Sequence, residues 1–178
     1  NLDSYQGTLA HNYYLYEQDG VFSIIPWDFN ESFGTFRMGC RDSNAMISLF
    51  IDEPTSGPLA DRPLIAKLLE NDSYKVAYHG YIQDLIDGVM DPATNAGTIT
   101  ETKTLIRAHV NNDPTAFYSY AEFEASLGGT MVGDILGLQG FVDDRTENMV
   151  NQLSGSEPIE GDGSGSCGGG TNPGPPPR

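Results

Sequence analysis

Three oxygen-bearing side chains in the first part of the chain have the types and spacing of a metal-assisted site. Asp3 lies in "NLDS", Asn12 opens the aromatic run "NYYLYE", and Asp28 follows the apolar run "VFSIIPW". A Gln-Asp-Gly sequence between the two runs favours a tight hairpin turn. Because the strands of a hairpin are antiparallel, we expect Asn12 and Asp28 to lie side by side at its open end.

Carboxylate and amide oxygens suit a hard cation such as Mg²⁺ that is also held by a substrate phosphate. Asp3 precedes Asn12 by 12 − 3 = 9 residues, on a loop leading into the same strand, and would be the third oxygen donor. Protein kinases use a catalytic Asp, an Asn that binds metal about five residues later, and a second Asp in Asp-Phe-Gly. Here Asp28 is followed by Phe29 and Asn30, so the kinase pattern is present in a stretched and altered form.

The elements that would position these residues are β-strands and loops. The segments "HNYYLYE" and "VFSIIPW" are aromatic or β-branched runs around a glycine-containing turn, which predicts a β-hairpin. Tyr13, Tyr14 and Tyr16 alternate along the first strand, so we expect both faces of the hairpin to be covered. Trp27 is the only tryptophan, and we expect it to pack in the core.

The following part of the chain reads as helices. Apolar residues at helical spacing predict helices at 63–71, 72–90, 93–112 and 134–153. Ser119 and Glu122 form a capping-box pattern for a further short helix. The predicted fold class is therefore α+β, with a β-hairpin followed by a mostly helical half.

The composition changes at Ser154, where a segment rich in Gly, Ser and Pro begins. Such a segment buries little apolar surface, so we predict one domain at residues 1–153 and a flexible linker at 154–178. Cys167 lies in this glycine-rich segment and Cys40 is far away in the sequence. A disulfide between them is possible, but their positions argue against it, and the spacing matches no zinc site.

The chain is acidic, with 9 Lys and Arg against 25 Asp and Glu and a formal net charge of −16. This charge argues against nucleic-acid binding, which depends on basic patches, and against docking on anionic lipid. No run of apolar residues in the sequence is long enough for a membrane span.

Several stretches together resemble the spore-coat protein H (CotH) kinase-like family over residues 1–153. They are "NLDSYQGTLAHNYYLY", "IIPWDFNESFG", "PLIAKLLENDSYKVAYHGYIQDLIDGVM", "DPTAFYSYAEFEASL" and a final helix with Arg145. The resemblance implies the C-lobe-like part of an atypical kinase-like fold. It also implies ATP- and Mg²⁺- (or Mn²⁺-) dependent transfer of phosphate to Ser or Thr of secreted or surface proteins.

The resemblance assigns roles to three residues. Asp3 matches the catalytic aspartate, Asp28 matches the metal-binding aspartate, and Asn12 would be a second ligand of the metal that accompanies ATP. The chain starts just before the catalytic loop, so we expect the ATP-clamping strands of an N-lobe to be absent and this piece to be inactive alone.

Two other functions are consistent with parts of the sequence. A kinase-like scaffold can lose its chemistry and serve as a surface domain in adhesion or assembly. A secreted glycosidase would use two carboxylates, but an Asn-Asp pair at the mouth of a hairpin fits a metal site better. The presence of both Asp3 and Asp28 favours the kinase-like reading.

Overall fold

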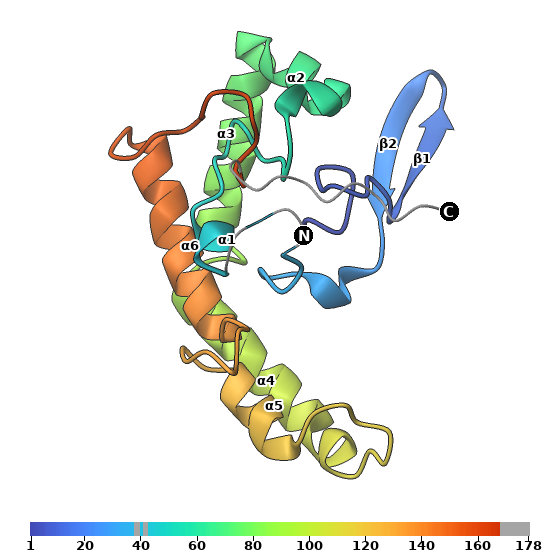
Figure 1. Ribbon diagram of the computed structural model, residues 1–178, viewed down its shortest axis with the longest axis vertical. Helices are drawn as coiled ribbons and strands as arrows, with labels where there is room; N and C mark the ends of the chain where they lie inside the picture. Colours follow the sequence, from blue (N-terminus) through green and yellow to red (C-terminus); the bar gives the residue numbers. More distant parts are fainter. Residues whose placement is uncertain (38–39, 41–42, 168–178) are drawn as a thin grey trace. The chain divides into compact units, whose positions relative to one another are not determined.

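The computed structural model describes residues 1–37, 40 and 43–167 (Figure 1). The chain forms two compact units. The first unit combines Asn1–Lys75 with the segment that starts at Pro158, and the second unit is Val76–Glu157. The second unit is therefore inserted into the sequence of the first.

The first unit contains the predicted hairpin, drawn in blue in Figure 1. Strand β1 (Tyr13–Gln18) pairs antiparallel with β2 (Val21–Pro26). Asp19 and Gly20 connect the strands, and both have a positive φ, 54° and 83°. This is the conformation that a two-residue hairpin turn requires and that Asp-Gly adopts readily, so the predicted register follows from the turn.

The prediction that both faces of this hairpin are covered is wrong. All six residues of β2 and five of the six residues of β1 are exposed. The physical reason is that, in the described part of the chain, the sheet consists of these two strands alone, so no further strand pairs with either of them. Trp27 is also 45% exposed, and its ring stacks on Tyr14 instead of entering the core.

Short helices complete the first unit. They are the 3-10 helices η1 (Phe29–Glu31) and η2 (Leu59–Asp61) and the α-helices α1 (Ser43–Ile47) and α2 (Pro63–Leu69). Pro63 occupies the first turn of α2, where its missing N–H costs no hydrogen bond. Leu2, Met46 and Ile51 are the buried apolar side chains around which these loops are arranged.

The second unit is helical, as predicted. Helix α3 (Asp72–Asp87) crosses the boundary between the units, and α4 (Pro92–Asn111), α5 (Tyr120–Ser126) and α6 (Leu138–Leu153) follow. Helices α4 and α6 pack against each other. The buried apolar side chains are Ile82, Ile86, Phe141, Val142 and Met149.

Two helix starts in this unit test the local sequence patterns. The capping box of α5 is confirmed, because Ser119 accepts from the N–H of Glu122 while the Glu122 carboxylate accepts from the N–H of Ser119. Helix α6 begins later than predicted, at Leu138. The residues before it form a small loop closed by the antiparallel bridge between Val132 and Ile135.

The α+β fold class is confirmed, and within the described residues no helix is long and apolar enough to cross a bilayer.

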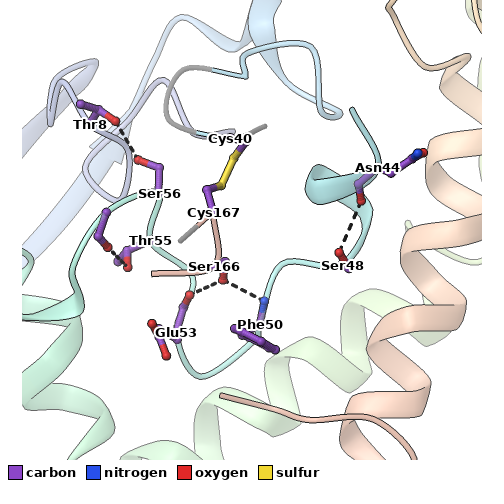
Figure 2. The surroundings of a disulfide bond; sticks show 11 residues. Thr8, Cys40, Asn44, Ser48, Phe50, Glu53, Thr55, Ser56, Ser166 and Cys167 are labelled. Atoms are coloured by element: carbon purple, nitrogen blue, oxygen red, sulfur yellow. Dashed lines mark hydrogen bonds between the residues drawn. A yellow bond between two sulfur atoms is a disulfide. The ribbon is translucent and has the colours of Figure 1, made fainter. Parts of the chain in front are cut away.

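The tail of the described chain corrects a prediction. Cys40 and Cys167 form a disulfide, although the glycine-rich surroundings of Cys167 argued against one (Figure 2). The pairing is possible because residues 158–167 return to the first unit, where the N–H of Asp52 donates to the carbonyl of Ile159 at 3.0 Å. These residues of the predicted linker are thus held in place, while residues 168–178 lie outside the described residues and their role as a linker stays a prediction.

A buried carboxylate holds this returning tail. Glu53 is 2% exposed, and its carboxylate accepts hydrogen bonds from the backbone N–H groups of Gly161, Gly163 and Gly165. Ser166 continues the contact, since its hydroxyl donates to the Glu53 carbonyl and accepts from the N–H of Phe50 at 2.8 Å (Figure 2). Gly165 has φ +96°, and a Cβ there would overlap the carbonyl oxygen of Gly57. The tail therefore needs glycine for a specific packing arrangement.

Candidate active site

The structure brings together two of the three predicted site residues directly. Asp3 and Asn12 are 8% and 7% exposed, and the Asn12 amide nitrogen Nδ2 donates to Asp3 Oδ2 at 2.8 Å. Since Nδ2 is the donor, the amide oxygen Oδ1 of Asn12 remains an acceptor. One side chain can thus orient a carboxylate with its nitrogen and bind a cation with its oxygen.

Asp28 is brought to the same end of the hairpin through the backbone. The N–H of Trp27 donates to the carbonyl of Asn12 at 3.0 Å, one step beyond the last strand pair, Tyr13 with Pro26. Asp28 follows directly. The expectation that the two strand ends lie side by side is confirmed, while the roles of the residues stay predictions.

The conformation of Asp28 is unusual. Its φ and ψ are 61° and 60°, in the left-handed region, and it precedes η1 without making a side-chain capping bond. An aspartate at this position would ordinarily serve as a helix cap. Here the exposed carboxylate is not used for capping, and strained backbone of this kind is concentrated at functional sites.

His11, a residue without a predicted role, lies beside Asp3 in the structure. Nε2 of His11 lies 3.2 Å from Asp3 Oδ1. In an extended strand, His11 and Asn12 would point to opposite faces. Ala10 and Asn12 instead have φ values of 49° and 57°, so the backbone turns and both neighbouring side chains reach one carboxylate. The sequence indicates the contact of His11 with Asp3 only weakly, through the position of His11 next to Asn12.

The loop that carries Asp3 is fixed to the rest of the first unit by polar contacts. Ser56 donates its N–H to the carbonyl of Gln6 at 3.2 Å, and its hydroxyl lies 3.0 Å from that of Thr8. The hydroxyl of Tyr5 accepts from the N–H of Leu64 at 3.1 Å. These contacts come from residues 48 to 59 positions away in sequence, and they hold the loop in a defined position.

The oxygen ligands that these residues offer fit a divalent cation whose remaining ligands come from a phosphate. The free oxygen of Asn12 and the carboxylate of Asp28 are hard ligands. The described residues hold no cluster of three His, Cys, Asp or Glu that would bind a metal by itself. Mg²⁺ is commonly held by one or two protein carboxylates with phosphate oxygens completing its shell, which this pair would allow.

The surroundings of Arg145 in the second unit indicate a structural role. Its Nη1 donates to Asn148 Oδ1 at 2.8 Å, and burial lowers the pKa of its guanidinium to about 10, so it remains charged at neutral pH. Asn148 also accepts from Gln152 at 2.7 Å, and its own nitrogen donates to Glu157. The arginine is part of a polar network within α6 and the residues that follow it.

The comparison with protein families identifies the class of this chain. The model of the CotH kinase protein family matches residues 1–149, and the chain belongs to that family. The matched range contains Asp3, Asn12 and Asp28. Comparisons with curated proteins and with solved structures found no match.

Proposed function

We propose that this chain is the C-lobe-like part of an atypical protein kinase that transfers phosphate from ATP to Ser or Thr of proteins. The observation that supports it best is the placement of Asp3 against Asn12, with Asp28 at the same end of the hairpin. These residue types in this order are those of the kinase catalytic loop and metal-binding motif. Membership of the CotH kinase protein family supports a kinase-like protein.

In this proposal, Asp3 orients the acceptor hydroxyl and receives its proton. The hydroxyl oxygen forms a bond to the γ-phosphorus of ATP, the bond from that phosphorus to the bridging oxygen breaks, and ADP leaves with the bonding electrons. Phosphoryl transfer depends mainly on positioning and on neutralising charge. The buried setting of Asp3, clamped by Asn12, supplies the positioning.

Asn12 Oδ1 and the Asp28 carboxylate would hold Mg²⁺ or Mn²⁺. When bound, the cation supplies positive charge to the phosphate oxygens. Asn12 would then contribute to both parts of the site, because its nitrogen contacts Asp3 and its oxygen would bind the cation.

The disulfide bears on where the protein works. Disulfides persist in oxidising compartments and are rare in the cytosol. The Cys40–Cys167 bond therefore supports a secreted or cell-surface protein, acting on secreted or surface substrates.

A non-catalytic surface domain is the second candidate, and the exposed hairpin favours it. Tyr14, Leu15, Val21 and Phe22 are each more than half exposed. Apolar surface of this kind is typical of contacts with another protein segment. In an assembly domain, the exposed hairpin would be the functional part and Asp28 would be dispensable.

The experiment is phosphate transfer from labelled ATP by the complete reading frame, with Mg²⁺ or Mn²⁺. Asp28→Asn should lower incorporation by about a hundredfold or more, since it removes a charge that acts on the reacting phosphate. Asp19→Asn is the matched control, because it makes the same change on the same hairpin and Asn-Gly suits the turn equally well. Both asparagines tolerate the left-handed conformation, so folding is preserved. Equal incorporation by Asp28→Asn and wild type would contradict the kinase proposal.

A further inference from the structure

We propose that His11 is a positioning residue for Asp3, an inference that rests on the proposed kinase function for its effect on activity. The starting observation is an asymmetry in the Asp3 carboxylate. Oδ2 accepts a 2.8 Å hydrogen bond from Asn12. Oδ1 is buried and accepts no hydrogen bond within the described part of the chain, and Nε2 of His11 faces it at 3.2 Å.

Leaving a buried carboxylate oxygen without a donor is costly. Nε2 of His11 is within reach of Oδ1 but not aligned as a hydrogen bond. Catalytic hydrogen bonds are often long or poorly aligned in the absence of substrate and tighten in the reactive complex. A small rotation of the His11 ring would complete the contact. The side chain of His11 is 43% exposed, so it has room to make this rotation.

The backbone supports the same conclusion. Ala10 has φ 49°, in a region that alanine rarely occupies because its Cβ crowds the backbone. With Asn12 also left-handed, His11 is flanked by two residues in this conformation. The effect of this turn is that the side chains of residues 11 and 12 approach one carboxylate from its two oxygens. Unfavourable backbone conformations persist where the surroundings require them, often at functional sites.

Two-sided contact has a mechanistic consequence. With Asn12 alone, the carboxylate could rotate about its Cβ–Cγ bond. With His11 on Oδ1 as well, the plane of the carboxylate is fixed, and a lone pair of defined direction remains for the acceptor hydroxyl. Misplacement of a reacting group by about 1 Å can lower a rate by about a hundredfold. His11 therefore acts through Asp3 and does not need to contact the substrate.

The test compares three variants of the complete protein. His11→Ala removes the donor, and His11→Gln restores one, because the glutamine Nε2 is as many bonds from Cβ as the histidine Nε2. His109→Ala is the matched control, an exposed histidine in α4 of the second unit. We expect His11→Ala to lower kcat by about tenfold to a hundredfold with KM for ATP unchanged, and His11→Gln to recover most of the loss. Wild-type kcat in His11→Ala, or no recovery in His11→Gln, would overturn the proposal.

A second measurement keeps this inference separate from the kinase proposal. The ¹³C signal of the Asp3 carboxyl group, assigned by comparison with Asp3→Asn, reports on its contacts without requiring activity. We expect His11→Ala to shift this signal and His109→Ala to leave it unchanged. If the signal shifts but the wild-type protein transfers no phosphate, the His11 contact stands and the kinase function fails. If His11→Ala leaves the signal unchanged, the contact is absent and the positioning role is refuted.

Discussion

Two buried carboxylates in the first unit, Asp3 and Glu53, are held in different ways. The Glu53 carboxylate accepts hydrogen bonds from three backbone N–H groups of the returning tail. Asp3 accepts a hydrogen bond from the side chain of Asn12, and the partly exposed imidazole of the adjacent His11 lies 3.2 Å from its other oxygen. Backbone donors are part of the fold and cannot leave without unfolding it. Side-chain donors can rotate, so they can release a carboxylate without unfolding the protein.

The carboxylates of Glu53 and Asp3 also differ in how many of their acceptor positions are occupied. A carboxylate offers about four lone-pair positions. Glu53 uses three of them for the tail, which makes it a structural residue. Asp3 accepts one aligned hydrogen bond from a side chain, so acceptor positions remain for the hydroxyl that we propose it orients. Burial alone therefore does not distinguish these two carboxylates, whereas the kind of donor around each one does.

The strongest way to break the Glu53 arrangement is to remove the disulfide that fastens its donors. The Cys40–Cys167 bond spans 127 residues, and in the chain-entropy account a loop of this length stabilises a protein by about 5 kcal/mol. The double variant Cys40→Ser, Cys167→Ser should lower the free energy of unfolding by this amount. Urea titration followed by the fluorescence of Trp27, the only tryptophan, measures it in the first unit. A loss below about 1 kcal/mol would mean that the Glu53 contacts hold the tail without the disulfide.

A pair of isosteric substitutions compares the carboxylates directly. Glu53→Gln turns an NH₂ group toward the tail's N–H donors, and it should cost about 3 kcal/mol of unfolding free energy because buried donors lose their acceptor. Asp3→Asn keeps an oxygen for Asn12, so it should cost less than about 1 kcal/mol. Phosphate transfer should respond in the opposite order, with Asp3→Asn inactive. Equal stability losses in the two variants would show that both carboxylates are structural.

The smallest effect concerns pH. The pKa of Asp162 in the tail is lowered by hydrogen bonds from the side chain and then the backbone of Ser164. A carboxyl group with a lowered folded pKa adds stability above its ordinary value of 3.8, and this stability is lost as pH falls through the folded pKa. Asp162→Asn should therefore flatten the dependence of unfolding free energy on pH below 3.8. Asp19→Asn, whose aspartate lies at the hairpin turn, is the control. An unchanged slope in Asp162→Asn would show that these hydrogen bonds do not stabilise the tail.

Local patterns explain what could be predicted from the sequence. The hairpin follows from its Asp-Gly turn, α5 from its capping box, and the meeting of Asn12 with the end of β2 from antiparallel geometry. The start of α6 was missed because the bridge between Val132 and Ile135 takes up the residues before it.

Non-local contacts explain what could not be predicted. The donors of the tail lie 108 to 112 residues from Glu53, so a glycine-rich composition indicates flexibility while the distant carboxylate imposes order. The contact of His11 depends on the left-handed turn at Ala10, and nothing in the residue type of alanine indicates it. The exposed hairpin reverses the expectation from its tyrosines, because alternation along a strand does not show what covers either face.

The position of the disulfide makes the polypeptide a covalent ring from Cys40 to Cys167, and the whole of Val76–Glu157 lies inside it. A protease that cuts the backbone once within that insertion opens the ring without separating the pieces. The two pieces stay linked through the disulfide, so the portion with Asp3 and Asp28 stays joined to the returning tail. In the extracellular setting proposed above, where proteases are common, this closure would give tolerance of damage as well as stability.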